Sequence, residues 1–321
     1  MNLINTTVCA ASLALGAFPA SADHHQTEAK IQGLYEGTWG GAKAEGRLIA
    51  TGKGGFKLLV RKEADGKVAR AELDGKLEGE ALKLSREDGK ASAACVNGAI
   101  EGAAGDGELA LKRVMRESPT AGKKPPTGAV VLIGPGKLDN MKPASQWMEQ
   151  DPKDGSTQVP KGGMNSLPTF AGSFDAHVEF QCPLEPENRS QGRANCGCYL
   201  PCGQEIQVLD SFGMTTYLGG GCGGLYGKKD PDTMEPIPSL VGNKENIFSL
   251  ASAPPLQWQT YDIEYRVKKN DQGVEAGSLT VRHNGIKIHD EVELNHKAGG
   301  FHFQDHSNPV RYRNIWVVER N

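Results

Sequence analysis

Apolar and polar residues alternate with a period of two along much of the chain, which is the pattern of half-buried β-strands. Residues 174–180 follow it, and residues 279–289 form two such runs around an Asn284-Gly285 turn signal. The alternation places three histidines on exterior strand faces: His177, His283 and His289. Because helical periodicity is almost absent, the sequence predicts an all-β protein whose larger part is a two-sheet sandwich.

The chain divides into two β-rich parts. Residues 31–115 read as a small antiparallel β domain, with hairpin turns predicted at four Asp-Gly pairs that begin at Asp65, Asp74, Asp88 and Asp106. Residues 116–127 are polar, contain two adjacent prolines and show no periodicity, so they are predicted to be a linker. Residues 128–321 form the predicted sandwich domain.

The N-terminus has the pattern of a secretory signal peptide. Residues 8–18 are an apolar run, and Ala20-Ser21-Ala22 fits the small-residue cleavage rule. We therefore predict a signal peptide over residues 1–22 and a mature protein that is exported, to the periplasm or beyond the cell. The apolar run is too short to span a bilayer.

Charge and cysteine content narrow the classes of partner and the redox chemistry. A formal net charge of −3 gives no reason to expect nucleic acid or an anionic membrane as a partner. In an exported protein, an even number of cysteines after the cleavage site favours disulfides. A structural metal and buried reduced thiols are the alternatives. These six residues are Cys95, Cys182, Cys196, Cys198, Cys202 and Cys222.

Candidate chemistry is concentrated in residues 191–213, where two short β runs face each other across a four-residue break. Alternation in the second run places Glu205 and Gln207 on one face and apolar residues on the other. Arg193 and Asp210 lie close by in sequence. This combination predicts a sugar-handling surface, with an ordinary solvated sheet face as the alternative.

An ordered series of motifs carries a family resemblance. The segments QGRANCGCYL, EIQVLDSFG, GGCGGLYGKKDP, PPLQWQTYDIEYR, VRHNGIKIHDEVEL and FQDHSNPVRYRNIWVVE resemble successive motifs of the 3-keto-disaccharide hydrolase family, from about residue 129 to the end. The resemblance implies a concanavalin A-like jelly-roll sandwich. It also implies cleavage of glycosidic bonds in oligosaccharides or disaccharides already oxidised to a ketone at carbon 3.

The cysteines depart from the family pattern. Where the family reads Arg-Gly-Asn-Ser-Gly-Val-Tyr, this chain has Cys196 and Cys198 in place of the serine and the valine. Many relatives carry a cysteine shortly before the Pro-Pro pair, as the partner of the cysteine that matches Cys222, but residues 249–253 of this chain contain none. The resemblance therefore leaves Cys222 to pair elsewhere, with Cys202 as one candidate, or to stay reduced.

A ketone at carbon 3 acidifies the proton on carbon 2, so a base can remove it and the glycosidic oxygen can leave. Glu205 is the predicted base, and Arg193 and Arg311 are predicted to stabilise the enolate. Asp305 or His306 would protonate the leaving oxygen. Three amides are predicted to bind sugar hydroxyls: Asn195, Gln207 and Gln304. Asp210 would bind substrate or hold the turn that follows it.

The sequence leaves three other interpretations of these residues open. A divalent metal bound by His306 with Glu205 or Asp210 would also suit these residue types. A non-catalytic carbohydrate-binding module would use the same sandwich. An ordinary retaining glycosidase would need two carboxylates about 5 Å apart on one face, and Asp210 lies out of phase with Glu205.

Overall fold

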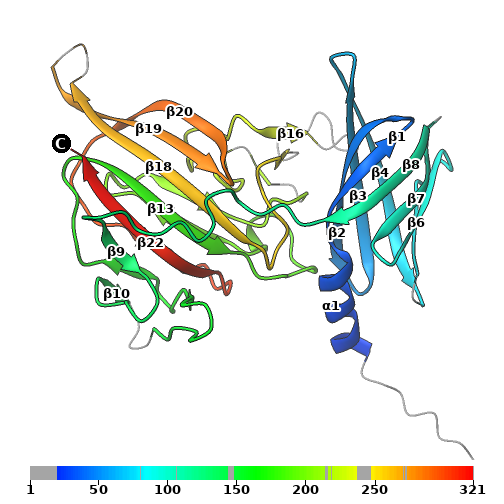
Figure 1. The fold of residues 1–321 in the computed structure, drawn as a ribbon, viewed down its shortest axis with the longest axis horizontal. Helices are drawn as coiled ribbons and strands as arrows, with labels where there is room; N and C mark the ends of the chain where they lie inside the picture. The colour runs from blue at the N-terminus through cyan, green and yellow to red at the C-terminus, as the bar shows by residue number, and fades with distance from the viewer. Residues whose placement is uncertain are drawn as a thin grey trace, which may run out of the picture.

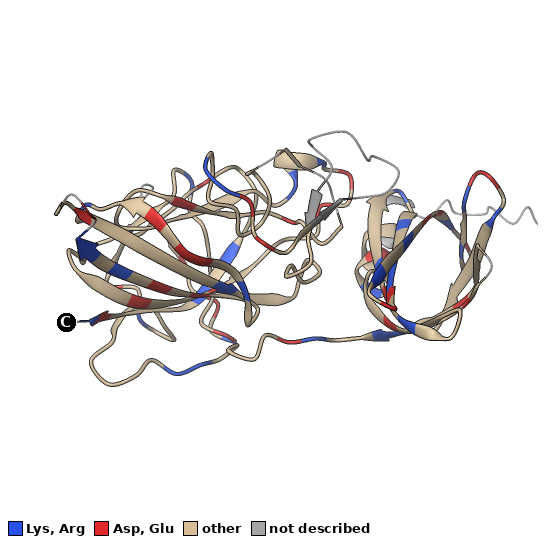
Figure 2. Cartoon of the chain, turned by 90° about the horizontal axis from the view of Figure 1, so that it is seen from above, with Lys and Arg blue, Asp and Glu red and all other residues tan. Residues whose placement is uncertain are grey.

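The computed structural model describes residues 20–79, 81–105, 107–143, 148–213, 216–217, 219–236, 247–269, 271 and 273–320. Figure 1 shows a β-barrel beside a larger β-sandwich, joined by an extended segment, with helix α1 (Ala20–Ile31) below the barrel. The predicted signal peptide falls almost wholly outside the described residues. Figure 2 shows basic and acidic residues interspersed along the strands of both bodies.

The N-terminal body is a closed eight-stranded antiparallel barrel in which each strand pairs with the next and β8 returns to β1. Closure leaves no unpaired strand edge. Its interior is filled by buried apolar side chains, among them Tyr35, Leu58 and Leu73. The strands are β1 (Gly33–Trp39), β2 (Ala42–Gly52), β3 (Gly55–Ala64), β4 (Lys67–Glu78), β5 (Ala81–Ser85), β6 (Ala91–Val96), β7 (Ala99–Ala104) and β8 (Gly107–Val114).

The Asp-Gly turn predictions have mixed outcomes. Asp65 lies in the β3–β4 turn and Asp88 in the β5–β6 turn, as predicted. The prediction at Asp74 is wrong, because Asp74 and Gly75 lie inside β4. A Cβ on Gly75 would lie 2.6 Å from Leu84 Cδ2, so this glycine admits a neighbouring side chain instead of making a turn. Asp106 lies outside the described residues.

The second body is a sandwich of two antiparallel sheets. The small sheet has the order β10-β12-β21-β14-β15, and the large sheet β11-β22-β13-β18-β19-β20, with β9 paired to β22. This architecture confirms the predicted all-β jelly-roll sandwich preceded by a small antiparallel β domain. The small-sheet strands are β10 (Met141–Pro143), β12 (Met164–Ser166), β14 (Cys196–Tyr199), β15 (Glu205–Val208) and β21 (His302–Phe303). Those of the large sheet are β9 (Val130–Ile133), β11 (Thr157–Gln158), β13 (Ser173–Gln181), β18 (Trp258–Lys269), β19 (Glu275–His283), β20 (Ile286–Asn295) and β22 (Arg311–Arg320). A separate pair joins β16 (Met234–Pro236) to β17 (Ile247–Ser249).

The cysteines differ from the disulfide prediction. The six predicted partners are all free thiols in the structure. Cys196 and Cys198 point into the core between the sheets, because they alternate with residues on the opposite face of β14. The Cys196 thiol donates to the Gln304 carbonyl at 2.8 Å, and the Cys222 sulfur lies 3.1 Å from the Tyr261 hydroxyl. The thiols therefore act as small core residues with polar contacts.

The segment after the barrel lies on the outer face of the large sheet (Figure 1). The Thr120 hydroxyl donates to Asp262 at 2.6 Å, and the Gly122 N–H donates to Glu179 at 2.6 Å. Ser118 and Thr260 hydroxyls are 2.6 Å apart. Although the segment lacks an apolar pattern, polar contacts hold it against the sheet.

This cover changes the environment of His177, which the alternation placed on an exterior face. His177 does point away from the core, but it is fully buried between Asp262 at 2.8 Å and Glu179 at 3.2 Å. Trp316 stacks on its ring at 5.3 Å. The predicted exposure is therefore wrong, because the segment and its neighbours cover this face. His283 and His289 are also buried.

We expect the His177 network to give a pH-dependent contribution to stability. Burial opposes the charge, but hydrogen bonds to Asp262 and Glu179 outweigh it and raise the pKa of His177. When the pKa of a histidine is raised by folding, its full contribution to stability is present below the unfolded-state pKa of about 6.5. This contribution is lost as the pH rises through the folded-state pKa. His177→Gln should therefore lower the free energy of unfolding more at pH 6 than at pH 9.

Urea titrations of both proteins across this range would measure the difference. His24→Gln is the matched control, because His24 is exposed. A His177→Gln effect of equal size at every pH would contradict the charged network.

Candidate active site

Four strands of the small sheet carry a row of polar side chains on the face away from the core. The register pairs Tyr199 with Glu205, Tyr199 with His302, and His302 with Asn165. Paired residues in an antiparallel sheet project from the same face, so these four lie side by side. We call Asn165, His302, Tyr199 and Glu205 the polar row. The residues that alternate with them, such as Cys198 and Phe303, are buried in the core.

Contacts within the polar row connect its members. His302 Nδ1 lies 3.0 Å from Asn165 Oδ1, and the rings of His302 and Tyr199 are 5.4 Å apart. Tyr199 lies opposite Glu205 in the sheet register and affects the pKa of its carboxylate. An acceptor-only carboxylate beside a phenol donor is a pair suited to moving or stabilising a proton.

Burial shifts the pKa values of three residues of the polar row. Burial raises the pKa of Glu205, against the opposing effects of Tyr199 and His306. Burial and the neighbouring Glu205 raise the pKa of Tyr199, and burial lowers the pKa of His302. At neutral pH the row therefore combines a neutral imidazole, a protonated phenol and a carboxylate that is more basic than usual.

A glycine makes room for this carboxylate. A Cβ on Gly197 would lie 2.3 Å from Glu205 Oε1, so no other residue fits there without moving the acid. The Gly197 carbonyl accepts from the Gln304 N–H at 2.9 Å, which ties the end of β21 to β14. Gln304 therefore borders the same face.

The side-chain amides of Gln191, Asn195 and Gln207 lie beside the polar row, and we call them the amide floor. Gln191 Oε1 accepts hydrogen bonds from Gln207 and Asn195, each at 3.0 Å, and its amide nitrogen donates to Thr216 at 2.6 Å. Gln207 Oε1 is buried with no hydrogen-bond partner among the described residues. An unpaired buried acceptor is unfavourable, so a hydroxyl donor from a ligand would stabilise it.

Two tyrosines stand at the rim. The hydroxyls of Tyr217 and Tyr226 are 2.7 Å apart, with the rings edge to face at 6.2 Å. Tyr226 is 44% exposed, and its N–H donates to the Glu205 carbonyl at 3.2 Å. An exposed aromatic surface next to polar groups is a common way to hold a sugar ring.

Arg193 and Asp210, two predicted site residues, lie away from this face. Arg193 is 0% exposed and donates to Asp210 at 2.6 Å, and its remaining nitrogens donate to backbone carbonyls, including those of Glu185 and Ala50. Asp210 also accepts from the Phe212 N–H at 3.2 Å. Since every guanidinium nitrogen is already paired in a buried site, this arrangement gives Arg193 a structural role and leaves it no access to an enolate.

The remaining predicted residues divide between the site and its surroundings. His306 is exposed and close enough to affect the pKa of Glu205. Asp305 accepts from the backbone N–H groups of Ser307 and Gly162, so it holds a turn. Arg311 belongs to the large sheet and donates to Ser156 at 2.6 Å. The structure thus brings Glu205, Gln207, Asn195, Gln304 and His306 together, and it separates Arg193, Asp210 and Arg311 from them.

Sequence reasoning missed several members of this face. Tyr199 follows Gly197 at the strand period of two, and this spacing could have placed it beside Glu205. His302 precedes Gln304 by the same spacing. Gln191 lies outside any strand, so periodicity gave no signal for it.

The sequence leaves open the alternative interpretation of a divalent metal bound by His306 with Glu205 or Asp210. Within the part of the chain that the structure describes, no group of three or more His, Cys, Asp or Glu side chains is placed to hold a metal ion. Asp210 is bound to Arg193 in a buried pair, so it does not join His306 and Glu205. The described cysteines form no such cluster either.

A comparison with protein-family models assigns the sandwich domain to a class of carbohydrate-active proteins. The family model of the 3-keto-alpha-glucoside-1,2-lyase-like domain matches residues 129–318, more than half of the chain. The chain belongs to this family, which confirms the resemblance noted in its motifs, and it is a carbohydrate-active hydrolase in the broad sense. The barrel lies outside the matched residues.

Among solved structures, the chain is similar to a "putative glycosyl hydrolase" from Parabacteroides distasonis ATCC 8503. The two share 27% identity with a TM-score of 0.49, over 61% of this chain and 86% of the other. No curated protein matches the chain. Among the residues that the structure describes, no helix has the length and apolar character needed to cross a membrane.

Proposed function

We propose that the polar face cleaves glycosidic bonds of sugars oxidised to a ketone at carbon 3, by elimination followed by hydration. The observation that carries this proposal is the environment of Glu205. It is a nearly buried carboxylate of raised pKa, which lies opposite Tyr199 in the sheet register and on the same strand face as Gln207. A single basic carboxylate suits removal of an acidified C–H proton.

The proposed reaction has two stages, elimination and then hydration. Glu205 takes the proton from carbon 2, the C–H electron pair forms the carbon 1–carbon 2 double bond, and the carbon 1–oxygen bond breaks. The leaving oxygen gains a proton, for which His306 is the candidate donor. In the second stage water adds its hydroxyl to carbon 1, and a proton returns to carbon 2.

Tyr199 has a separate part in this scheme. Its phenol stays protonated at neutral pH, because burial and Glu205 raise its pKa. It can therefore donate a hydrogen bond to the oxygen on carbon 3 as negative charge develops there, which replaces the predicted role of Arg193. Gln207, with its unpaired oxygen, would accept from a sugar hydroxyl, and Tyr226 would support the departing ring.

The geometry argues against an ordinary retaining glycosidase. That mechanism needs a second carboxylate about 5 Å from the first on the same face. Asp210, the other acid of the stretch, is 3% exposed and bound to Arg193. A lectin-like role would use the same amides and tyrosines but would not need the raised pKa of Glu205.

Substrate comparison tests the proposal. Purified protein should release the leaving group from a 3-keto-glucoside or 3-ketotrehalose and leave the unoxidised parent sugar intact, because only the ketone acidifies the carbon 2 proton. Product release followed by chromatography measures both. Cleavage of the parent sugar at a comparable rate would favour the ordinary glycosidase, and binding without any turnover would favour the lectin-like module.

The predicted signal peptide supports a second, independent part of the proposal, that the protein acts after export. Residues 1–22 would then be absent from the mature protein. N-terminal sequencing of protein recovered from the periplasm or the medium, starting at Asp23, would support it, and retention of the full chain in the cytoplasm would contradict it.

A further inference from the structure

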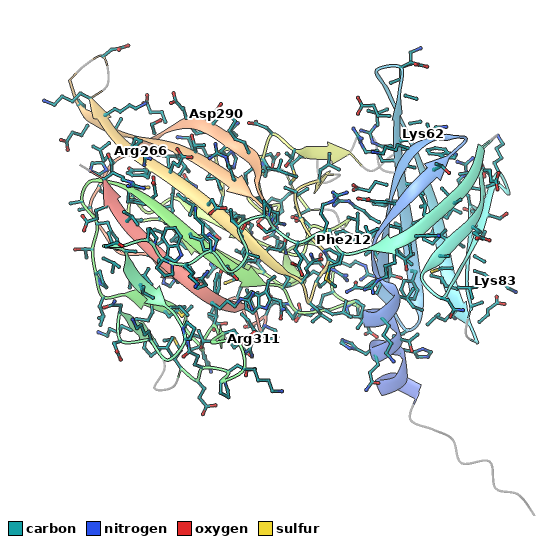
Figure 3. The ribbon with its side chains drawn as sticks, in the orientation of Figure 1. Lys62, Lys83, Phe212, Arg266, Asp290 and Arg311 are labelled. Carbon is teal, nitrogen blue, oxygen red and sulfur yellow. The ribbon has the colours of Figure 1, made fainter. Side chains whose placement is uncertain are left out.

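The barrel packs on the sandwich through the outer face of β2. Arg47 is 3% exposed and donates to the carbonyls of Ser249 and Leu250 at 2.9 and 2.7 Å. Its guanidinium also lies over the ring of Phe212, at 5.0 Å. Figure 3 shows Phe212 where the two bodies meet. Its Nε atom pairs with Glu45 at 3.1 Å, so loss of the two carbonyls would leave the other guanidinium N–H donors, which are deeply buried, without these acceptors.

Apolar side chains of both bodies pack beside these bonds from Arg47. Ile49, Leu59 and Leu34 of the barrel form one buried cluster with Phe212 of the sandwich. A Cβ on Gly213 would lie 2.5 Å from Ile49 Cδ1, so the loop after Asp210 packs closely against this barrel side chain. The two bodies thus meet in an apolar contact that is packed like a protein core, and we call this contact the joint.

The end of β2 reaches toward the sugar site. The Ala50 carbonyl accepts from Arg193 at 3.2 Å, and the Thr51 carbonyl accepts from Arg189 at 2.8 Å. These two arginines flank the short 3-10 turn η1 (Ser190–Gly192). Barrel backbone therefore anchors the chain on both sides of this turn.

Gln191 is the middle residue of the turn that the barrel anchors. Its side-chain oxygen accepts hydrogen bonds from the amides of Gln207 and Asn195, and its side-chain nitrogen donates to Thr216. The path from the barrel to the amide floor is therefore short. It runs from a β2 carbonyl to an arginine, along one or two residues of backbone, and then to the Gln191 side chain.

We propose that the barrel is a positioning element of the sugar site, which holds Gln191 so that the amides of Gln207 and Asn195 face the bound sugar. The barrel itself is not the sugar-binding module in this account, because apolar side chains fill its interior. The effect on turnover rests on the proposed function, whereas the effect on the position of the turn does not.

Two full-chain variants and a control test the inference. Ile49→Ala loosens the joint without touching residues 187–195. Arg189→Gln removes the bond to Thr51, together with the bonds of the same exposed side chain to the Pro186 and Asn188 carbonyls. Val60→Ala is the control, because Val60 is buried in the barrel interior and belongs to a different cluster. Hydrogen exchange of the peptide covering residues 187–195, measured by mass spectrometry, reports the turn directly.

Both test variants should exchange this peptide roughly tenfold faster than wild type, and Val60→Ala should change exchange in barrel strands only. With a 3-keto-glucoside, the test variants should raise KM by roughly tenfold with a smaller change in kcat. Arg189→Lys, which keeps a donor for the Thr51 carbonyl, should recover part of both effects.

Unchanged exchange of residues 187–195 in Ile49→Ala and Arg189→Gln would overturn the positioning role, whatever the activity. Faster exchange with KM and kcat both at wild-type values would also overturn it, because the turn would then move without consequence for the site. If no protein turns over a keto-sugar, the proposed function fails. Faster exchange together with weaker binding of a plain oligosaccharide would still support the positioning role.

Discussion

Replacing Glu205 with glutamine is expected to lower turnover of a 3-keto-glucoside by about 100-fold or more while leaving the melting temperature almost unchanged. Glutamine keeps the size of the side chain and an acceptor for Tyr199, but it cannot take a proton. Steady-state kinetics and a thermal melt of the same preparation measure the two quantities. Glu293→Gln, at an exposed position on the large sheet, is the matched control.

The pH profile adds an independent check on Glu205. Burial raises the pKa of this carboxyl, so the wild-type kcat/KM should fall with decreasing pH at a higher pH than an ordinary carboxyl would give. The residual activity of Glu205→Gln should lack this acid limb. Near-normal turnover in Glu205→Gln would show that another group is the base.

The second large effect is expected on stability. Arg193→Ala should lower the free energy of unfolding by about 3–5 kcal/mol, because it leaves the buried Asp210 carboxylate unpaired. It also removes the donors to the Glu185 and Ala50 carbonyls. Chemical denaturation, monitored on the full chain, measures the change.

A double variant separates charge burial from packing at this site. Arg193→Met combined with Asp210→Leu removes both charges and should recover part of the lost stability. If Arg193→Ala instead folds with wild-type stability and loses only turnover, the guanidinium is catalytic, as its sequence context first suggested.

Strand periodicity accounts for most of what the sequence could predict. Alternation correctly placed Phe174, Val178 and Phe180 in the core, and Asn284-Gly285 does form the turn between β19 and β20, with φ of 50° and 80°. Period two also placed Glu205 and Gln207 on one face, which the register of β14 and β15 confirms. Local geometry determines these features, so a local pattern reveals them.

Long-range contacts explain the errors. Alternation correctly turned His177 away from the core, but it carried no information that residues 117–123 would cover that face. Likewise, Arg193 contacts the Ala50 carbonyl, 143 residues away in sequence. A polar side chain near a candidate site has the same local pattern whether it contacts ligand or a distant backbone carbonyl, and only the packed structure distinguishes the two.

The most direct test of the central claim is the fate of the carbon 2 hydrogen. The protein is incubated with a 3-keto-glucoside in heavy water, and the released keto-sugar is analysed by NMR and mass spectrometry, with protein-free and Glu205→Gln samples as controls. Abstraction and hydration predict one deuterium at carbon 2 of the product, at a rate that follows cleavage. Cleavage that leaves the original hydrogen on carbon 2 would contradict the elimination mechanism.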